Sequence, residues 1–258
     1  MVRGGTVIVA LDARNDGDEG AILSLAFAAG QRPDRETVLA LADGENVGAR
    51  FTASHLSDPA DGWVELLAAG LTFDCRGLAP AAPQPLPRHE ALLGLEAKPV
   101  GEAIAIAPGP HLADAAGMLP VVKVLAGIGA TIAQLPGVQA VAWNPARCWM
   151  PPAYFRKVVS GWLGGGPFPA LGLTSLQRDR DGSMQTVGLA LLTGQELVFA
   201  PDRKLGPADI ARIAVRLIHA LIEVEPLAAP HQFTGPDGET IDVVPYDEGQ
   251  QLSVSVRR

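Results

Sequence analysis

The chain lacks most of the features from which a function can be assigned to a sequence. Aromatic residues make up only 5% of its 258 residues, and its two cysteines, Cys75 and Cys148, lie far apart. The longest apolar stretches are broken by Pro120, Lys123 and Gly127, so no segment is long enough to cross a membrane. The apolar run near the N-terminus is too short for the core of a signal peptide. We therefore expect a cytoplasmic protein with reduced thiols and no membrane partner.

Basic residues are too scattered to form a surface for nucleic acid. The formal net charge is −8, and Arg178 and Arg180, which come closest to a basic cluster, alternate with Asp179 and Asp181. Nucleic-acid binding needs a patch of cations that displaces counterions from the phosphates. The composition, with 48% hydrophobic and 19% charged residues, instead predicts a globular protein without a nucleic-acid partner.

Sequence patterns typical of metal-binding and phosphate-binding sites are absent as well. The five histidines do not occur at a spacing that places two imidazoles on one face of an element. The acidic segment 12–19 fails as a calcium loop, because Arg14 and Leu23 fall where an EF-hand needs oxygen ligands. The glycines in 127–130 and 164–166 lie within or after expected helices, whereas a phosphate loop precedes a helix. The sequence predicts no metal site and no cofactor.

Hydrophobic periodicity in the first part of the chain predicts an α+β unit. The expected order is a strand, a helix, two strands, a helix and a strand, at residues 6–11, 16–29, 37–41, 47–56, 58–67 and 71–75. This β-α-β-β-α-β order is that of the split β-α-β, or ferredoxin-like, arrangement. We expect one such unit over residues 1–78.

A proline-rich segment separates this unit from the rest. Prolines stand at positions 80, 83, 85, 87 and 99. Because proline lacks an amide donor and fixes φ, residues 79–99 are expected to form an extended linker or surface arm, with room for a short helix at 90–95.

Residues 100–258 predict a second α+β unit that repeats the element order of the first. Strands are expected at 102–107, 138–143, 170–176, 187–192 and 252–256, helices at 110–134 and from 151 and 207, and a hairpin at 233–244. Pro120 should kink or split the first helix. The fold class is therefore α+β with two ferredoxin-like-related units, the second elaborated by an inserted helix and a C-terminal hairpin.

Five segments of the second half follow one another in a recognisable order: "VQAVAWNPARCWMPPAYF", "FPALGLTSL", "VGLALLTGQELVFAP", "ADIARIAVRLIHALIEV" and "FTGPDGETIDVVPY". In this order and pattern, residues 103–256 resemble the bacterial domain-of-unknown-function family numbered 4261. The resemblance implies that this part of the chain forms a unit and that the protein is bacterial and cytosolic. The family has no activity to carry over, so the resemblance assigns no catalytic residue.

Aromatic residues concentrate between residues 143 and 168, although the chain as a whole has few of them. They could form a hydrophobic core around the inserted helix. They could instead form the wall of a pocket or a partner surface, because aromatic residues and arginine dominate binding hot spots. The candidate binding residues are Trp143, Arg147, Trp149, Tyr154, Phe155 and Trp162.

Cys148 is the candidate nucleophile. It precedes a helix that opens with two prolines, and a thiol near a helix N-terminus can have a lowered pKa. No base is identifiable by spacing, and no flanking pattern of a known cysteine hydrolase surrounds it. A hydrolase that uses Cys148 or an unrecognised acidic pair is one alternative for the function.

The absence of catalytic spacing, together with the aromatic segment, favours a non-enzymatic binding or protein-interaction module with a protein or small-molecule partner. A second alternative is a self-associating scaffold. Residues 252–256 alternate like an edge strand, and an unpaired edge can pair across a two-fold axis to give a homodimer.

Overall fold

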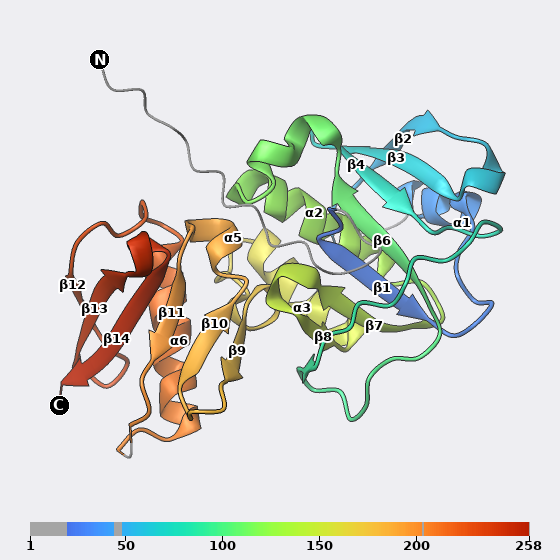
Figure 1. Ribbon diagram of the computed structural model, residues 1–258. Coiled ribbons are helices and arrows are strands. Elements are labelled where there is room, and N and C mark those ends of the chain that lie inside the picture. The colour runs from blue at the N-terminus through green and yellow to red at the C-terminus, as the bar shows by residue number, and fades with distance from the viewer. Residues whose placement is uncertain (1–19, 44–47, 203, 258) are drawn as a thin grey trace.

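The computed structural model of the protein describes residues 20–43, 48–202 and 204–257. Figure 1 shows two β-sheets side by side, the first formed by the blue-to-green part of the chain and the second by the orange-to-red part. Within the described residues the first sheet has eight strands and the second has six, and helices accompany both. The predicted α+β class is confirmed.

The first sheet has the strand order β2-β3-β4-β6-β1-β7-β8-β5. Neighbouring strands in it are antiparallel, except for the parallel pair β5 and β8. Its strands are β1 (Leu23–Phe27), β2 (Thr52–Leu56), β3 (Trp63–Ala68), β4 (Leu71–Arg76), β5 (Ala91–Leu92), β6 (Glu102–Pro108), β7 (Val138–Trp143) and β8 (Cys148–Met150). The centrally placed β1 pairs with β6 on one side and β7 on the other, and all five of its residues are buried.

Two long helices, α2 (Leu119–Ile132) and α3 (Pro152–Leu163), pack against one face of this sheet and against each other. Pro120 lies in the first turn of α2, where its missing amide costs no hydrogen bond. The expected split of the helix over 110–134 is therefore confirmed, with the 3-10 helix η3 (Pro110–Ala115) before it. The other short elements of this half are α1 (Arg35–Ala40), η1 (Leu41–Asp43), η2 (Pro59–Asp61) and η4 (Asn144–Ala146).

The proline-rich segment 79–99 lies along the opposite face of the first sheet. That face carries small side chains, among them Ala26, Ala140 and Ala142, and three leucines of the segment pack against them: Leu86, Leu92 and Leu95. A buried histidine of the segment, His89, contacts Asn144 through a 3.0 Å hydrogen bond of its Nε2. The predicted surface arm is thus extended and docked onto the sheet, and β5 replaces the short helix expected at 90–95.

The second sheet has the order β12-β13-β14-β11-β10-β9, with β11 and β14 parallel. Its strands are β9 (Ser175–Arg178), β10 (Met184–Val187), β11 (Glu196–Phe199), β12 (His231–Thr234), β13 (Thr240–Tyr246) and β14 (Gln251–Arg257). In Figure 1, α6 (Pro207–Leu221) lies behind β10 and β11. Its buried side chains form the predicted apolar stripe: Ile210, Ile213, Ala214, Leu217, Ile218 and Leu221. Two single turns, α4 (Ala170–Leu173) and α5 (Ala190–Thr193), and the 3-10 turn η5 (Asp247–Gly249) complete this half.

Backbone contact docks the two sheets together. Gly188, which follows β10, approaches η4 so closely that a Cβ at its position would lie 2.8 Å from the amide nitrogen of Ala146. The half-buried carboxylate of Glu196 holds the Gly188 segment, because it accepts hydrogen bonds from Gly188 N (2.8 Å), Ala190 N (3.0 Å) and the Thr186 hydroxyl (2.6 Å). Burial raises the pKa of Glu196 against the opposing effect of these hydrogen bonds. Buried apolar residues of both sheets belong to one continuous core.

Several predicted elements of the first half are wrong. Residues 23–27 form β1 where a helix was expected, and 35–40 form α1 where a strand was expected at 37–41. The helix expected at 58–67 is the short turn η2 followed by β3. The strand expected at 6–11 lies outside the described residues. The β-α-β-β-α-β order, and with it the first ferredoxin-like unit, is therefore not confirmed.

The second half differs from its predicted elements at three places. Residues 170–173 form a helical turn before β9, and the strand expected at 187–192 is the end of β10 followed by α5. The strand at 252–256 exists as β14, but it lies inside the sheet between β13 and β11, so the expected exposed edge is wrong. The expected strands at 102–107 and 138–143, the helices from 151 and 207 and the hairpin at 233–244 are confirmed.

The first sheet takes strands from both sides of the segment 79–99. β4 precedes this segment and β6 follows it, yet the two strands are hydrogen-bonded neighbours. The predicted units 1–78 and 100–258 therefore share one sheet, and the change from the first sheet to the second falls between β8 and β9.

Candidate functional site

Four of the six predicted binding residues lie in the hydrophobic core: Trp143, Trp149, Phe155 and Trp162. Trp143 and Phe155 have no exposed surface, and Trp149 is 1% exposed. Arg147 is exposed at the end of η4, where its backbone adopts the left-handed conformation with φ 49°. A fully buried side chain cannot touch a partner directly, so Trp143 and Phe155 support a site and do not line one.

The tryptophans of β7 and β8, Trp143 and Trp149, face opposite sides of the first sheet. Trp143 belongs to the main core on the helix side, and its indole Nε1 has no hydrogen-bond partner. Trp149 packs among the alanines on the face that the arm occupies, with its ring 6.1 Å from that of His89. Trp149 therefore anchors the proline-rich arm.

Tyr154 and Trp162 line an apolar groove with a volume of about 350 Å³, and Trp162 is only 7% exposed there. The groove lies where α3 meets α4 and α6. Its walls are formed by Tyr154, Lys157, Val158, Gly161, Trp162, Pro167, Phe168, Pro169, Ala170, Leu171, Val215 and His219. Side chains from the aromatic segment and from α6 thus meet at one concave surface, which sequence periodicity could not place together.

Two polar groups of the groove wall form hydrogen bonds within the wall itself. The hydroxyl of Tyr154 donates to the carbonyl of Leu171 at 2.8 Å, and Nε2 of His219 donates to the carbonyl of Phe168 at 2.8 Å. Burial raises the pKa of Tyr154, so its hydroxyl keeps its proton as a donor. The groove accordingly presents an apolar surface.

Trp162 is fixed in the groove from two sides. Its ring meets that of Phe168 edge to face, with centroids 5.2 Å apart, and the ammonium of Lys123 lies 5.3 Å from its ring centroid. Both contacts have favourable electrostatic geometry for an indole. The groove is therefore preorganised around Trp162.

Cys148 lies outside the groove in β8. Its side chain is buried, and the recorded hydrogen bond of Sγ runs to the backbone carbonyl of Trp149 at 3.5 Å. Burial raises the pKa of the Cys148 thiol, which is the opposite of the activation that a nucleophile requires. The geometry gives no support to Cys148 as the nucleophile of a hydrolase.

Thiol labelling tests the interpretation that Cys148 is a buried thiol and not an activated nucleophile. Burial also raises the pKa of Cys75 to about 12, so both thiols should stay protonated in the native protein at mildly alkaline pH. We expect native labelling to be at least about 100-fold slower than labelling of the urea-unfolded chain, because access requires structural opening. The variant Cys75→Ser isolates the rate of Cys148. A rate for Cys148 above that of a free thiol would contradict the interpretation and restore the nucleophile hypothesis.

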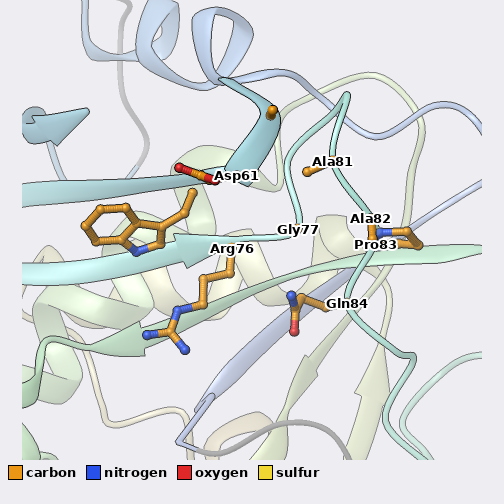
Figure 2. A pocket seen from close by; sticks show the side chains of 9 residues that line it. Asp61, Arg76, Gly77, Ala81, Ala82, Pro83 and Gln84 are labelled. Carbon is orange, nitrogen blue, oxygen red and sulfur yellow. The ribbon is translucent and has the colours of Figure 1, made fainter. Parts of the chain in front are cut away.

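A second pocket, which the sequence did not indicate, lies where β3 and β4 meet the start of the arm. Its volume is about 540 Å³, and Figure 2 shows the residues that line it: Ala60, Asp61, Trp63, Arg76, Gly77, Ala81, Ala82, Pro83 and Gln84. Trp63 and Arg76 are directly paired across the two strands. Because residues 58–67 were expected to form a helix, this pairing could not be foreseen.

In the part of the chain that the structure describes, no group of three or more histidine, cysteine or acidic side chains is arranged to hold a metal ion. In the same part, no helix is long and apolar enough to cross a membrane. Comparisons of the chain with protein-family models, with curated proteins and with solved structures found no match.

Proposed function

We propose that this chain is a non-enzymatic interaction module that receives an apolar side chain of a partner protein in the groove between α3 and α6. The observation that carries the proposal is the groove itself, in which Trp162, Val158 and Val215 form an apolar hollow. The Tyr154 hydroxyl and Nε2 of His219 are already hydrogen-bonded within the wall, so an apolar side chain can enter without leaving either of them unpaired.

The size of the groove supports a side chain as the occupant. A volume of about 350 Å³ lies at the lower end of the range of roughly 300–1,000 Å³ for pockets that enclose drug-sized ligands. Exposed residues at the rim, Lys157 and Pro167, leave the groove open to a protein surface. One large apolar anchor, such as a leucine or phenylalanine on a partner segment, would fit within the hollow, and its neighbours would lie along the rim.

The relationship of residues 103–256 to the bacterial family of unknown function, and the cytosolic location that it implies, are part of the same proposal. Neither adds an activity. An interaction module is consistent with a family for which sequence offers no catalytic residue.

Gly161 provides the means to test the groove without disturbing the core. This residue is exposed in α3 and lines the groove, and a Cβ added to it would meet nothing within 4 Å. Gly161→Phe should fill the groove, whereas Gly161→Ala should leave it open. Both replacements remove a glycine from a helix interior, so Gly161→Ala should stabilise α3 by up to about 1 kcal/mol.

The measurement is selection of displayed random peptides on the wild-type protein, followed by titration of the selected peptides. We expect the selected peptides to share one large apolar residue. They should bind the wild type and Gly161→Ala equally and bind Gly161→Phe at least about tenfold more weakly, as for the loss of a binding hot spot. Selection of no apolar anchor, or equal binding to Gly161→Phe, would overturn the proposal.

A further inference from the structure

The pocket between β3, β4 and the arm differs from the groove in its chemistry, because it carries charges. Figure 2 shows the side chains of Asp61, Arg76 and Gln84 projecting from three different segments around it. Asp61 ends the turn η2, Arg76 ends β4, and Gln84 belongs to the arm. A site built from three segments exists only in the folded protein.

Arg76 is held at one end and open at the other. Its Nη2 donates to Oδ2 of Asp74 at 2.7 Å, and the side chain of Asp74 is only 6% exposed. The Arg76 side chain itself is 49% exposed, and its Nε and Nη1 atoms form no hydrogen bond or ion pair with the residues that the structure describes. Asp74 thus fixes the guanidinium plane while two donors remain free for a planar acceptor such as a carboxylate.

The charged and polar side chains that line this pocket do not pair with one another. Asp61 is exposed, and its carboxylate forms no ion pair or hydrogen bond with the described residues. The side-chain amide of Gln84 is likewise without a recorded partner, although its backbone N donates to the carbonyl of Ala103 at 3.0 Å. The lining therefore offers one free carboxylate, one cation with free donors and one amide, and these do not satisfy one another.

The backbone of the pocket is fixed by a buried arginine. Arg32 is 8% exposed and forms an ion pair with Glu102 at 2.7 Å. The same guanidinium donates to the carbonyl of Gly77 and, at 2.9 Å, to that of Ala81. Because both carbonyls belong to the pocket lining, binding would require little ordering of this loop.

From these contacts we infer that the pocket binds a small zwitterion, an amino acid or dipeptide, whose carboxylate pairs with Arg76 and whose ammonium pairs with Asp61. The indole of Trp63 supplies an apolar wall for the ligand's side chain. A phosphate dianion fits less well, because Asp61 and Asp74 place two negative charges beside the single cation Arg76. The site lies apart from the proposed groove and does not depend on it.

The test compares free ligands with chemically capped forms of the same ligands. Isothermal titration and ligand-observed NMR would use leucine, phenylalanine and alanyl-alanine, each with its N-acetyl and C-terminal amide derivatives. We expect the amides to bind about tenfold more weakly, since they lose a charge-assisted pair with Arg76. The N-acetyl forms should bind about threefold more weakly, since the carboxylate of Asp61 is exposed. Selective binding of the free amino acids or of alanyl-alanine would identify which source of the zwitterion the pocket prefers.

Asp61→Asn is the decisive variant, because it leaves the Asp74–Arg76 pair intact. It should remove the difference between free and N-acetylated ligand, while Asp179→Asn, an exposed carboxylate on the second sheet, should keep it. Removing Arg76 alone would leave the buried carboxylate of Asp74 without its cation and would destabilise the fold. The double variant Asp74→Asn/Arg76→Gln avoids this unpaired charge and therefore tests the contact between Arg76 and the carboxylate of the ligand. The inference is overturned by absence of saturable binding at millimolar ligand, or by capped and free forms binding equally.

Discussion

Replacing Trp143 by alanine is expected to lower the free energy of unfolding by about 3–5 kcal/mol. The side chain has no exposed surface and packs in the main core between the first sheet and its helices. Its removal would leave a cavity that the neighbouring strands cannot close, because β7 is paired on both sides, with β1 and with β8. Urea denaturation followed by circular dichroism would measure the change.

The matched variant Trp143→Phe separates packing from hydrogen bonding. The indole Nε1 of Trp143 is buried without a partner, so phenylalanine removes an unsatisfied donor while it keeps most of the apolar surface. We expect the loss to fall to about 1–2 kcal/mol. A Trp143→Ala variant as stable as the wild type would show that Trp143 is not a core residue and would return it to the candidate binding surface.

The helix α6 was predictable because it has one buried face, whereas the conformation of β1, which is buried on both faces, was not. The stripe of α6 repeats with helical period because its other side faces water. In β1 every residue from Leu23 to Phe27 is buried, so the strand shows no alternation. Ile22, Leu25, Ala26 and Ala29 then happened to match a helix, and only the neighbouring strands β6 and β7 decide the conformation.

The hairpin of β3 and β4, which the sequence did not predict, turns at Ala69 and Gly70. Ala69 and Gly70 both have positive φ, 50° and 79°, as the two-residue turns of hairpins require. Alanine rarely adopts that conformation, so the pair "AG" is a weak signal in a sequence. Without the hairpin, Trp63 could not be placed beside Arg76, and the charged pocket was lost from the prediction.

The edge prediction for β14 failed for a different reason. Alternation of buried residues identifies a strand, but it does not identify the strands beside it. β14 lies parallel to β11, and the chain between them contains α6 and the strands β12 and β13. Such a pairing between strands far apart in the sequence is not encoded by any local pattern. Self-association through an unpaired C-terminal strand is therefore excluded for β14 as it is described.

Replacing Gly188 by alanine is expected to destabilise the protein by about 3 kcal/mol or more, through the docking of the two sheets. The residue has φ +93°, a conformation that strains any side chain, and its Cβ would lie within 2.9 Å of backbone atoms of Ala146 and Pro145. Backbone atoms cannot rotate away as the end of a flexible side chain can, so one sheet must shift relative to the other. Denaturant unfolding of the purified variant would measure the loss.

Gly194→Ala is the matched control, because it shares the strained conformation but not the contact. Gly194 has φ +74°, and a Cβ there would meet nothing within 4 Å. Its loss should be about 1 kcal/mol from backbone strain alone, so the excess in Gly188→Ala measures the contact between the sheets. If the two variants lose equal stability, the approach of Gly188 to η4 does not hold the sheets together. If Gly188→Ala loses more, hydrogen exchange should show added opening at η4 and β10, where the two sheets meet.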